Sequence, residues 1–303
     1  MPELPEVETV RKGLMDWTLG RTITAVEVRH PRAVRRHLLG ARDFADKLRG
    51  QVIEGVHRRG KYLWLELSDF PLIAHLGMSG QFRVEKEELA HPHVRVHFTL
   101  NDGILLFLDQ RTFGGFHIDE WSDQRGDQRS DERSDERSDE RSGDGSESHV
   151  PLSISHIGLD PFDPSFDLDR AVGQLRGKDS EVKRVLLDQR VVSGVGNIYA
   201  DEALFLAGVH PRRIASSLTR AQAQLVLEEA RAVMAAALEA GGTSFDALYV
   251  NVNGESGYFD RALQVYQRDG QPCPRCGGLI KREEFMNRGS HFCPRCQRAP
   301  RSR

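Results

Sequence analysis

The sequence predicts an α+β protein of several domains, in which a leading helix and an antiparallel sheet precede a helical region and a small terminal module. Segments between residues 22 and 108 alternate apolar and polar residues with the period of two that marks half-buried strands. From residue 151 onward apolar residues recur at helical spacing. All four cysteines lie near the end, in two Cys-x-x-Cys pairs. A chain of 303 residues has room for more than one domain.

The leading helix is expected over residues 5–18. Pro5 suits the first helical position, and Glu6 and Glu8 suit the positive end of the helix dipole. The apolar residues that follow at helical spacing are predicted to be core: Val7, Val10, Leu14 and Trp17.

The helix start does not explain Pro2-Glu3. Once Met1 is removed, Pro2 presents an α-amine, which titrates near ~7.7–8.0 and is therefore partly unprotonated at neutral pH. Such an amine can attack an electrophilic carbon and form an imine, and Glu3 beside it can transfer protons. From the opening residues alone, a plain helix start is the simpler interpretation.

Five segments predict the strands of an antiparallel sandwich or flattened barrel. Asn101-Asp102-Gly103 predicts a tight turn between the last two. The segments are 22–28, 51–56, 62–67, 93–100 and 104–108.

Three polar motifs interrupt the strand pattern. Arg58-Arg59-Gly60-Lys61 is a basic turn, His75 to Gly80 places Met78 between glycines, and Asp109 to Gly115 contains Arg111 and Phe113. A methionine or an aromatic ring can wedge between bases, and a guanidinium can read base edges. Each motif alone is more simply an ordinary loop.

Residues 122–148 are of low complexity, with ten acids against five arginines and three Arg-Ser-Asp-Glu units. No apolar residue is available there for burial, so a disordered, self-neutralising linker is expected.

The helical region is expected to contain helices within 168–175, 180–192 and 218–240, with Lys178 and Lys183 exposed. Between them, Gly194-Val195-Gly196-Asn197 forms a compact turn whose amides could point at a phosphate. The loop-like stretch 243–264 is long enough to be a lid or a binding loop.

The cysteines give the strongest single motif. Cys273-x-x-Cys276 and Cys293-x-x-Cys296 have the spacing of a tetrahedral zinc site in a β-ribbon. Four thiolates leave no open position on the metal, so one structural Zn²⁺ is predicted. Arg288 lies on the hairpin between the two pairs, where it could contact a phosphate or simply face solvent.

Composition excludes several classes of protein. No run of 18 apolar residues is present, so no membrane span is expected, and the N-terminus lacks the pattern of a signal peptide. Metal-type cysteine spacing indicates a reducing, cytoplasmic location. Residues 271–303 hold eight Lys or Arg against two Glu, which favours phosphate partners.

Together these motifs resemble the bacterial formamidopyrimidine-DNA glycosylase family, whose members remove 8-oxoguanine and ring-opened purines. The resemblance covers nearly everything except 122–148. Its motifs, in chain order, are Met1-Pro-Glu-Leu-Pro-Glu-Val-Glu-Thr, Arg59-Gly-Lys-Tyr62, His75-Leu-Gly-Met-Ser-Gly80, Asp109-Gln-Arg-Thr-Phe-Gly114, Leu187-Asp-Gln-Arg190, Gly194-Val-Gly-Asn-Ile-Tyr199, Asp201-Glu-Ala-Leu204, Gly257-Tyr-Phe259 and the zinc finger with Cys296-Gln297.

The resemblance implies an N-terminal β-sandwich with a leading helix, a helix–two-turn–helix domain and a C-terminal zinc-finger β-hairpin, with DNA bound between domains. The expected divisions are 1–121 for the catalytic sandwich, 122–150 for the linker, 151–264 for the helical domain with its lesion-capping loop, and 265–303 for the finger. It further implies a bacterial enzyme acting on double-stranded DNA that contains oxidised purines, and a monomer is expected.

Residue roles carry over by position. Pro2 would be the nucleophile at C1′, Glu3 the proton-transfer group, and Glu6 a support. Lys61 and Arg288 would assist β- and δ-elimination beside phosphates. Met78, Arg111 and Phe113 would fill the space left by the flipped nucleotide and contact the orphaned cytosine. The phosphate-contacting positions would be His91, Lys178 and Asn197.

Two other functions remain open from the sequence. A related endonuclease VIII-type enzyme would prefer oxidised pyrimidines; Leu4 and the Met78, Arg111 and Phe113 set argue against it. A zinc-finger DNA-binding protein without catalysis is disfavoured by Pro2-Glu3 and Lys61. Two departures from the family pattern are Thr112, where relatives often carry a second basic residue, and Asp160, where glutamate is common.

Overall fold

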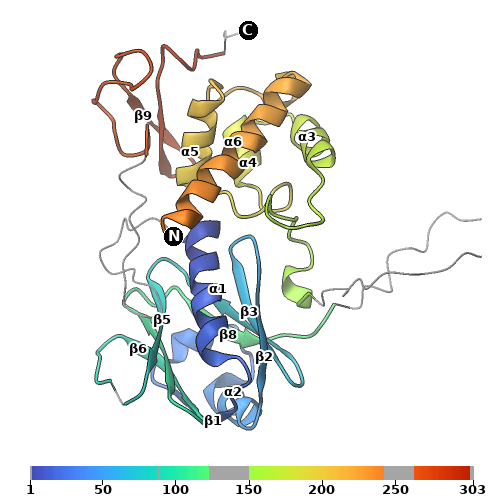
Figure 1. Cartoon of the computed structure of the whole chain (residues 1–303), viewed down its shortest axis with the longest axis vertical. Helices are drawn as coiled ribbons and strands as arrows, with labels where there is room; N and C mark the ends of the chain where they lie inside the picture. Colours follow the sequence, from blue (N-terminus) through green and yellow to red (C-terminus); the bar gives the residue numbers. More distant parts are fainter. Residues whose placement is uncertain (1, 88, 123–149, 242–262, 301–303) are drawn as a thin grey trace, which may run out of the picture.

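The computed structural model describes residues 2–87, 89–122, 150–241 and 263–300 (Figure 1). Three sequence-based predictions fall wholly or mainly outside these residues: removal of Met1, the linker at 122–148 and the capping loop at 243–258.

The N-terminal part is an antiparallel sandwich of two four-stranded sheets beside helix α1 (Leu4–Thr18). Four phenylalanines pack between the sheets, and the ring centroid of Phe116 lies 4.8 Å from that of Phe107 and 5.4 Å from that of Phe98. One sheet has the order β1 (Ile23–Val28), β6 (Val94–Leu100), β7 (Ile104–Asp109), β5 (Gly80–Glu85), and the other β2 (Ile53–Arg59), β3 (Tyr62–Leu67), β4 (Pro71–His75), β8 (Gly115–Ile118).

The sandwich contains all five predicted strands and four elements that were not predicted. These are β4, β5, β8 and helix α2 (Gly40–Leu48); the 3₁₀ turn η1 (Pro31–Val34) precedes α2. The additional strands are short, begin with proline or glycine and are set by pairing with distant partners. The prediction for Trp17 was wrong: its side chain is 44% exposed, whereas the neighbouring Thr18 is fully buried, so Trp17 lies on the outer face of the last turn of α1.

The helical part follows with η2 (Leu152–Ile154), α3 (Leu168–Arg176), α4 (Val182–Leu187), α5 (Asn197–Leu206), η3 (Ala215–Ser217) and α6 (Arg220–Glu239). Thr219 begins α6 with a capping box, since its side chain accepts from the amide of Gln222 and Gln222 bonds back. The core of this part is built mainly from α3 to α6.

Helix α1 joins the two cores. Its first residue, Leu4, is fully buried in the helical core, whereas Val7, Val10 and Leu14 are buried in the sandwich core. The start of α1 therefore lies at the meeting point of the two parts, near the end of α6 (Figure 1). This placement puts the N-terminal residues between the domains.

The terminal module is a hairpin of β9 (Lys281–Phe285) and β10 (Arg288–Phe292) flanked by the cysteine pairs. Met286 and Asn287 form the two-residue turn, with φ of 50° and 59°. Two left-handed residues are the mark of a type I′ hairpin turn. The turn places Arg288 at the first position of β10. The predicted combination of sandwich, helical domain and finger hairpin is thereby confirmed.

Candidate active site

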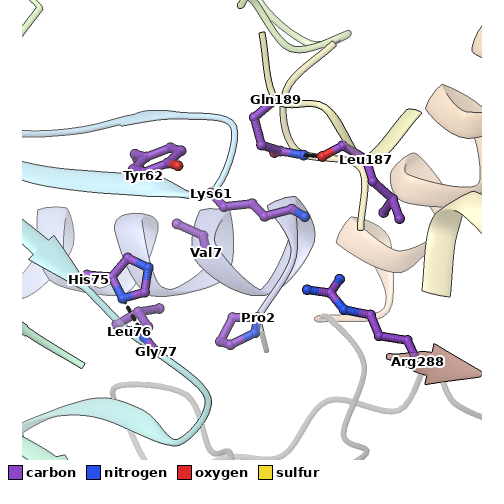
Figure 2. A pocket seen from close by; sticks show the side chains of 10 residues that line it. All are labelled: Pro2, Val7, Lys61, Tyr62, His75, Leu76, Gly77, Leu187, Gln189 and Arg288. Atoms are coloured by element: carbon purple, nitrogen blue, oxygen red, sulfur yellow. Dashed lines mark hydrogen bonds between the residues drawn. The ribbon is translucent and has the colours of Figure 1, made fainter. Parts of the chain in front are cut away.

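Pro2 lines a cavity of about 120 Å³ formed by all three parts of the chain. The sandwich contributes Lys61 and His75, the helical part Gln189, and the finger Arg288. Figure 2 shows the Lys61 ammonium and the Arg288 guanidinium pointing into the space beside the Pro2 ring. Residues separated by nearly the whole sequence therefore meet around Pro2.

Glu3 is buried and binds the start of α5. Its carboxylate accepts hydrogen bonds from the backbone amides of Ile198 (2.9 Å) and Tyr199 (3.5 Å). The positive end of a helix stabilises a carboxylate at this position. A Cβ at Gly196 would lie 2.2 Å from Cδ of Glu3, so only glycine leaves room for this approach.

The contact corrects the prediction for the glycine turn. The sequence suggested that amides of this turn could point at a phosphate. In the structure the amides of Ile198 and Tyr199, which follow the turn at the start of α5, instead bind a carboxylate of the same chain. Gly194 has φ of +92°, and its carbonyl accepts from the amide of Leu4 at 3.1 Å. The turn therefore holds the N-terminal segment in place.

Glu6 supports this arrangement from within α1. Its Oε2 accepts from the backbone amide of Glu3 at 2.8 Å, and its Oε1 accepts from the hydroxyl of Tyr199 at 2.9 Å. The carboxylate thus fixes the backbone next to Pro2 and ties it to α5.

Burial shifts the pKa values of Glu3 and Lys61. Desolvation, helped by the charge of Glu6, raises the pKa of Glu3, although Lys61 and the two α5 amides oppose it. Desolvation also lowers the pKa of Lys61, with Arg288 acting in the same direction and Glu3 opposing it. A carboxyl with a raised pKa and an amine with a lowered pKa exchange protons more readily than unshifted groups, so this pair is suited to proton transfer.

Lys61 is held by a buried network that the sequence did not reveal. Arg58 donates to Glu8 Oε2 at 2.9 Å and to Asp160 Oδ2 at 2.7 Å, and Asp160 also accepts from the amide of Gly60 at 3.1 Å. The basic turn of residues 58–61 is therefore bound to α1 and to the helical part and is not simply exposed to solvent. Lys61 Nζ itself donates to the carbonyl of Val195 at 2.8 Å.

Gln189 is a second residue that the sequence reasoning missed. Its side-chain amide donates to the carbonyls of Leu187 and Val195, both at 3.0 Å, and its Oε1 accepts from the amide of Gly194 at 2.9 Å. It lines the cavity and braces the glycine turn. The only signal for it was its place in the Leu187-Asp-Gln-Arg190 motif.

The three proposed void-filling residues lie together on the surface. Met78 and Phe113 are 41% and 45% exposed, and Arg111 Nη1 lies 3.8 Å from Met78 Sδ. Exposed apolar side chains beside a guanidinium suit contact with bases.

The proposed phosphate-contacting residues are more dispersed. His91 is half-buried, and its Nδ1 accepts from the amide of His93 at 3.2 Å. Lys178 is exposed just beyond α3, beside a hollow that Arg184 and Met286 also line. Asn197 begins α5 and donates to the carbonyl of Gly289 at 3.0 Å, which ties α5 to the finger.

The prediction that Lys183 is exposed was wrong. Its side chain is fully buried and its Nζ lies 2.5 Å from Asp201 Oδ1. Asp201 also accepts from the Ser290 hydroxyl (3.0 Å) and the His291 amide (2.8 Å). Helical periodicity did not reveal this burial, because the finger strand that covers Lys183 is distant in sequence. The pair fastens the strand that begins with Arg288 to α5.

The four cysteines form a cluster suited to zinc. Their sulfur atoms all lie within 4.8 Å of one another. Four thiolates converging in this way match the donor set of one structural zinc ion, as predicted.

Comparison with known proteins agrees with this architecture. Residues 1–116 match the formamidopyrimidine-DNA glycosylase N-terminal domain, residues 157–248 its H2TH domain, and residues 270–299 the zinc finger found in FPG and IleRS. Formamidopyrimidine-DNA glycosylases of Mycobacterium avium and Rhodococcus erythropolis are 54% and 52% identical, each aligned over at least 99% of both chains.

Solved structures give the same result. A Lactococcus lactis FPG mutant in complex with Fapy-dG containing DNA superposes with a TM-score of 0.81 at 32% identity. MutM in complex with carbocyclic 8-oxo-G containing DNA gives 0.80, also at 32% identity. Each comparison covers 98% of this chain and 100% of the other. The chain belongs to the formamidopyrimidine-DNA glycosylase family of DNA-repair enzymes.

Proposed function

We propose that this protein excises oxidised purines, 8-oxoguanine and formamidopyrimidines, from double-stranded DNA and then cleaves the strand, with Pro2 as the nucleophile. The observation that carries the proposal is the meeting of Pro2, Lys61 and Arg288 around one cavity, with Glu3 buried beside it. Relatives solved with lesion-containing DNA support the substrate class.

Base excision would begin with attack of the Pro2 amine on C1′ of the damaged nucleoside. The glycosidic bond breaks, and its electron pair leaves with the base. Glu3 is suited to supply a proton during base loss and sugar-ring opening, since burial raises its pKa. Loss of the amine proton and opening of the sugar ring, in which the C1′–O4′ bond breaks and O4′ takes up a proton, leave a cationic iminium between Pro2 and C1′.

Strand cleavage would follow from that iminium, whose positive charge makes the C2′ protons acidic. Removal of one expels the 3′ phosphate by β-elimination. Removal of the C4′ proton from the resulting conjugated iminium then expels the 5′ phosphate. Lys61 and Arg288 are placed to stabilise the negative charge of these leaving groups, and the lowered pKa of Lys61 also suits proton transfer.

The remaining residues would hold the distorted duplex. Met78, Arg111 and Phe113 would occupy the space of the extruded nucleotide, with Arg111 reading the orphaned cytosine. His91, Lys178 and Asn197 would contact phosphates, and Glu6 would brace the N-terminus. The divisions 1–121, 122–150, 151–264 and 265–303 remain our proposal for the folding units.

We also propose that the protein is a cytoplasmic monomer and does not bind a membrane. None of the described helices is both long and apolar enough to cross a bilayer.

Competing duplexes test the substrate class. One carries 8-oxoguanine opposite cytosine and the other thymine glycol, the preferred class of an endonuclease VIII-type enzyme. We expect faster excision of 8-oxoguanine by the intact protein and loss of excision in Pro2→Gly. Faster excision of thymine glycol would overturn the assignment to purines, and unchanged activity of Pro2→Gly would overturn the role of Pro2.

A further inference from the structure

Residue Arg35 lies outside every motif that carried the family resemblance, yet its guanidinium reaches the loop that carries Phe113. Nη1 donates to the carbonyl oxygens of Thr112 (3.2 Å) and Gly114 (3.3 Å), and Nη2 donates to that of Phe113 (2.8 Å). Nη1 also reaches the carbonyl of Arg32 at 2.9 Å. One side chain therefore binds three consecutive carbonyls of the loop.

The loop needs such support, because its backbone is unfavourable. Thr112 has φ of 54°, a left-handed conformation that a β-branched residue rarely adopts. Conformations of this kind persist only where the surroundings hold them in place. The peptide groups on both sides of Thr112 must therefore be fixed if Arg111 and Phe113 are to keep their positions.

The opposite side of the loop is held by Asp109. This residue is 1% exposed, and its carboxylate accepts from the amides of Arg111 (3.1 Å) and Gly114 (2.7 Å). It also accepts from the hydroxyl of Ser79 at 2.6 Å, which couples the loop to the turn carrying Met78. Asp109 thus binds amides while Arg35 binds carbonyls.

The turn that carries Met78 packs directly on this loop. A Cβ at Gly77 would lie 2.5 Å from the amide nitrogen of Gly114 and 2.6 Å from the carbonyl carbon of Phe113. Movement of the 112–114 backbone would therefore displace Met78 as well as Phe113. All three void-filling side chains depend on one clamped segment.

We propose that Arg35 is a positioning residue for recognition of the base opposite the lesion, acting by clamping the carbonyls of residues 112–114. The inference rests on the proposed function, in which Met78, Arg111 and Phe113 enter the duplex. It assigns Arg35 no part in the chemistry at Pro2.

Two reactions separate the clamp from the chemistry. Borohydride trapping on a single-stranded oligonucleotide with an abasic site needs Pro2 but no filling of a duplex. Excision of 8-oxoguanine from duplexes, with cytosine or adenine opposite, needs both. We expect Arg35→Ala to trap the single strand within about twofold of the parent, and to lose on the order of ten- to hundredfold in duplex excision opposite cytosine. Its preference for cytosine over adenine should shrink.

Two further variants keep the test decisive. Arg35→Lys retains the positive charge but lacks the planar fork that spans several carbonyls, so it should resemble Arg35→Ala. Arg36→Ala removes a neighbouring arginine whose side chain makes no hydrogen bond to 109–115 among the described residues, and it should behave as the parent.

Parent-like duplex excision and base preference in Arg35→Ala would overturn the clamp, as would full activity of Arg35→Lys, which would show that charge alone matters. Loss of single-strand trapping in Arg35→Ala would also count against it, since the residue would then affect the chemistry. Failure of the parent protein itself to trap the single strand would instead refute the proposed function.

Discussion

Replacing Gly196 by alanine should displace the Glu3 carboxyl, the proposed proton donor, while leaving the fold intact. The added Cβ would lie 2.2 Å from Cδ of Glu3 and 2.4 and 2.5 Å from its two oxygens. Ordinary contact begins at 3.4 Å, so Glu3 must retreat by about 1 Å. The backbone itself accepts alanine, because Gly196 has φ of −120°.

The expected cost follows from that displacement. A misplacement of about 1 Å at a reacting group can reduce a rate on the order of a hundredfold, or about 2.7 kcal/mol in the barrier. Weakening the bonds to the amides of Ile198 and Tyr199 should lower the free energy of unfolding by about 1 kcal/mol.

Single-turnover excision of 8-oxoguanine measures the effect, and thermal unfolding checks the fold. Gly173→Ala is the matched control, because a Cβ there meets no atom within 4 Å and the residue lies in α3, where alanine is favourable. If folded Gly196→Ala excised 8-oxoguanine at a rate within about twofold of the control, the role assigned to Glu3 would be refuted.

Three other predictions concern the finger and the pH dependence. Lys183→Met leaves the Asp201 carboxylate buried without its cation and should lower the free energy of unfolding by about 3 kcal/mol. The control Lys12→Met replaces an exposed lysine on α1 and should change the free energy of unfolding by less than about 0.5 kcal/mol. Denaturant unfolding measures both variants, and equal effects would contradict the buried ion pair. Because burial raises the pKa of Glu3, its carboxyl should stay protonated to a pH above the usual glutamate pKa of about 4.3. The excision rate should decline as the pH rises further and the fraction of protonated Glu3 falls. Glu3→Gln cannot lose a proton and should lack this decline, so a variant with the parental pH profile would exclude Glu3 as its source. Metal analysis should find one zinc per folded chain, and Cys293→Ser should lose both the metal and duplex binding; folded parent protein without zinc would contradict the structural site.

Local patterns in the sequence predicted much of the fold. The apolar spacing of α1, the alternation of five strands and the paired cysteines each depend on neighbouring residues, so they can be read along the chain. The short strands β4, β5 and β8 could not be read in this way, because their pairing partners stabilise them.

The site was harder to predict because it is assembled from distant segments. Asp160 and Arg58 are separated by 102 positions, and Asp201 meets His291 across 90. Helical periodicity predicted that Lys183 is exposed, because periodicity reflects only neighbouring residues and not contacts with segments later in the chain. Pro2 and Glu3 were proposed from the family resemblance and their chemistry. Gln189 stood in a family motif but had no role until its contacts were known, and Arg35 lay in no motif at all.

The proposed reaction depends on a covalent bond between DNA and the amine of Pro2 after Met1 is removed. The most direct test is to reduce the complex with an 8-oxoguanine duplex using borohydride, digest it and locate the cross-link by mass spectrometry. We expect a nucleotide remnant on a peptide that begins with Pro2, in protein shown to lack Met1. A cross-link on Lys61 or any other residue, or no cross-link in protein that lacks Met1, would contradict it.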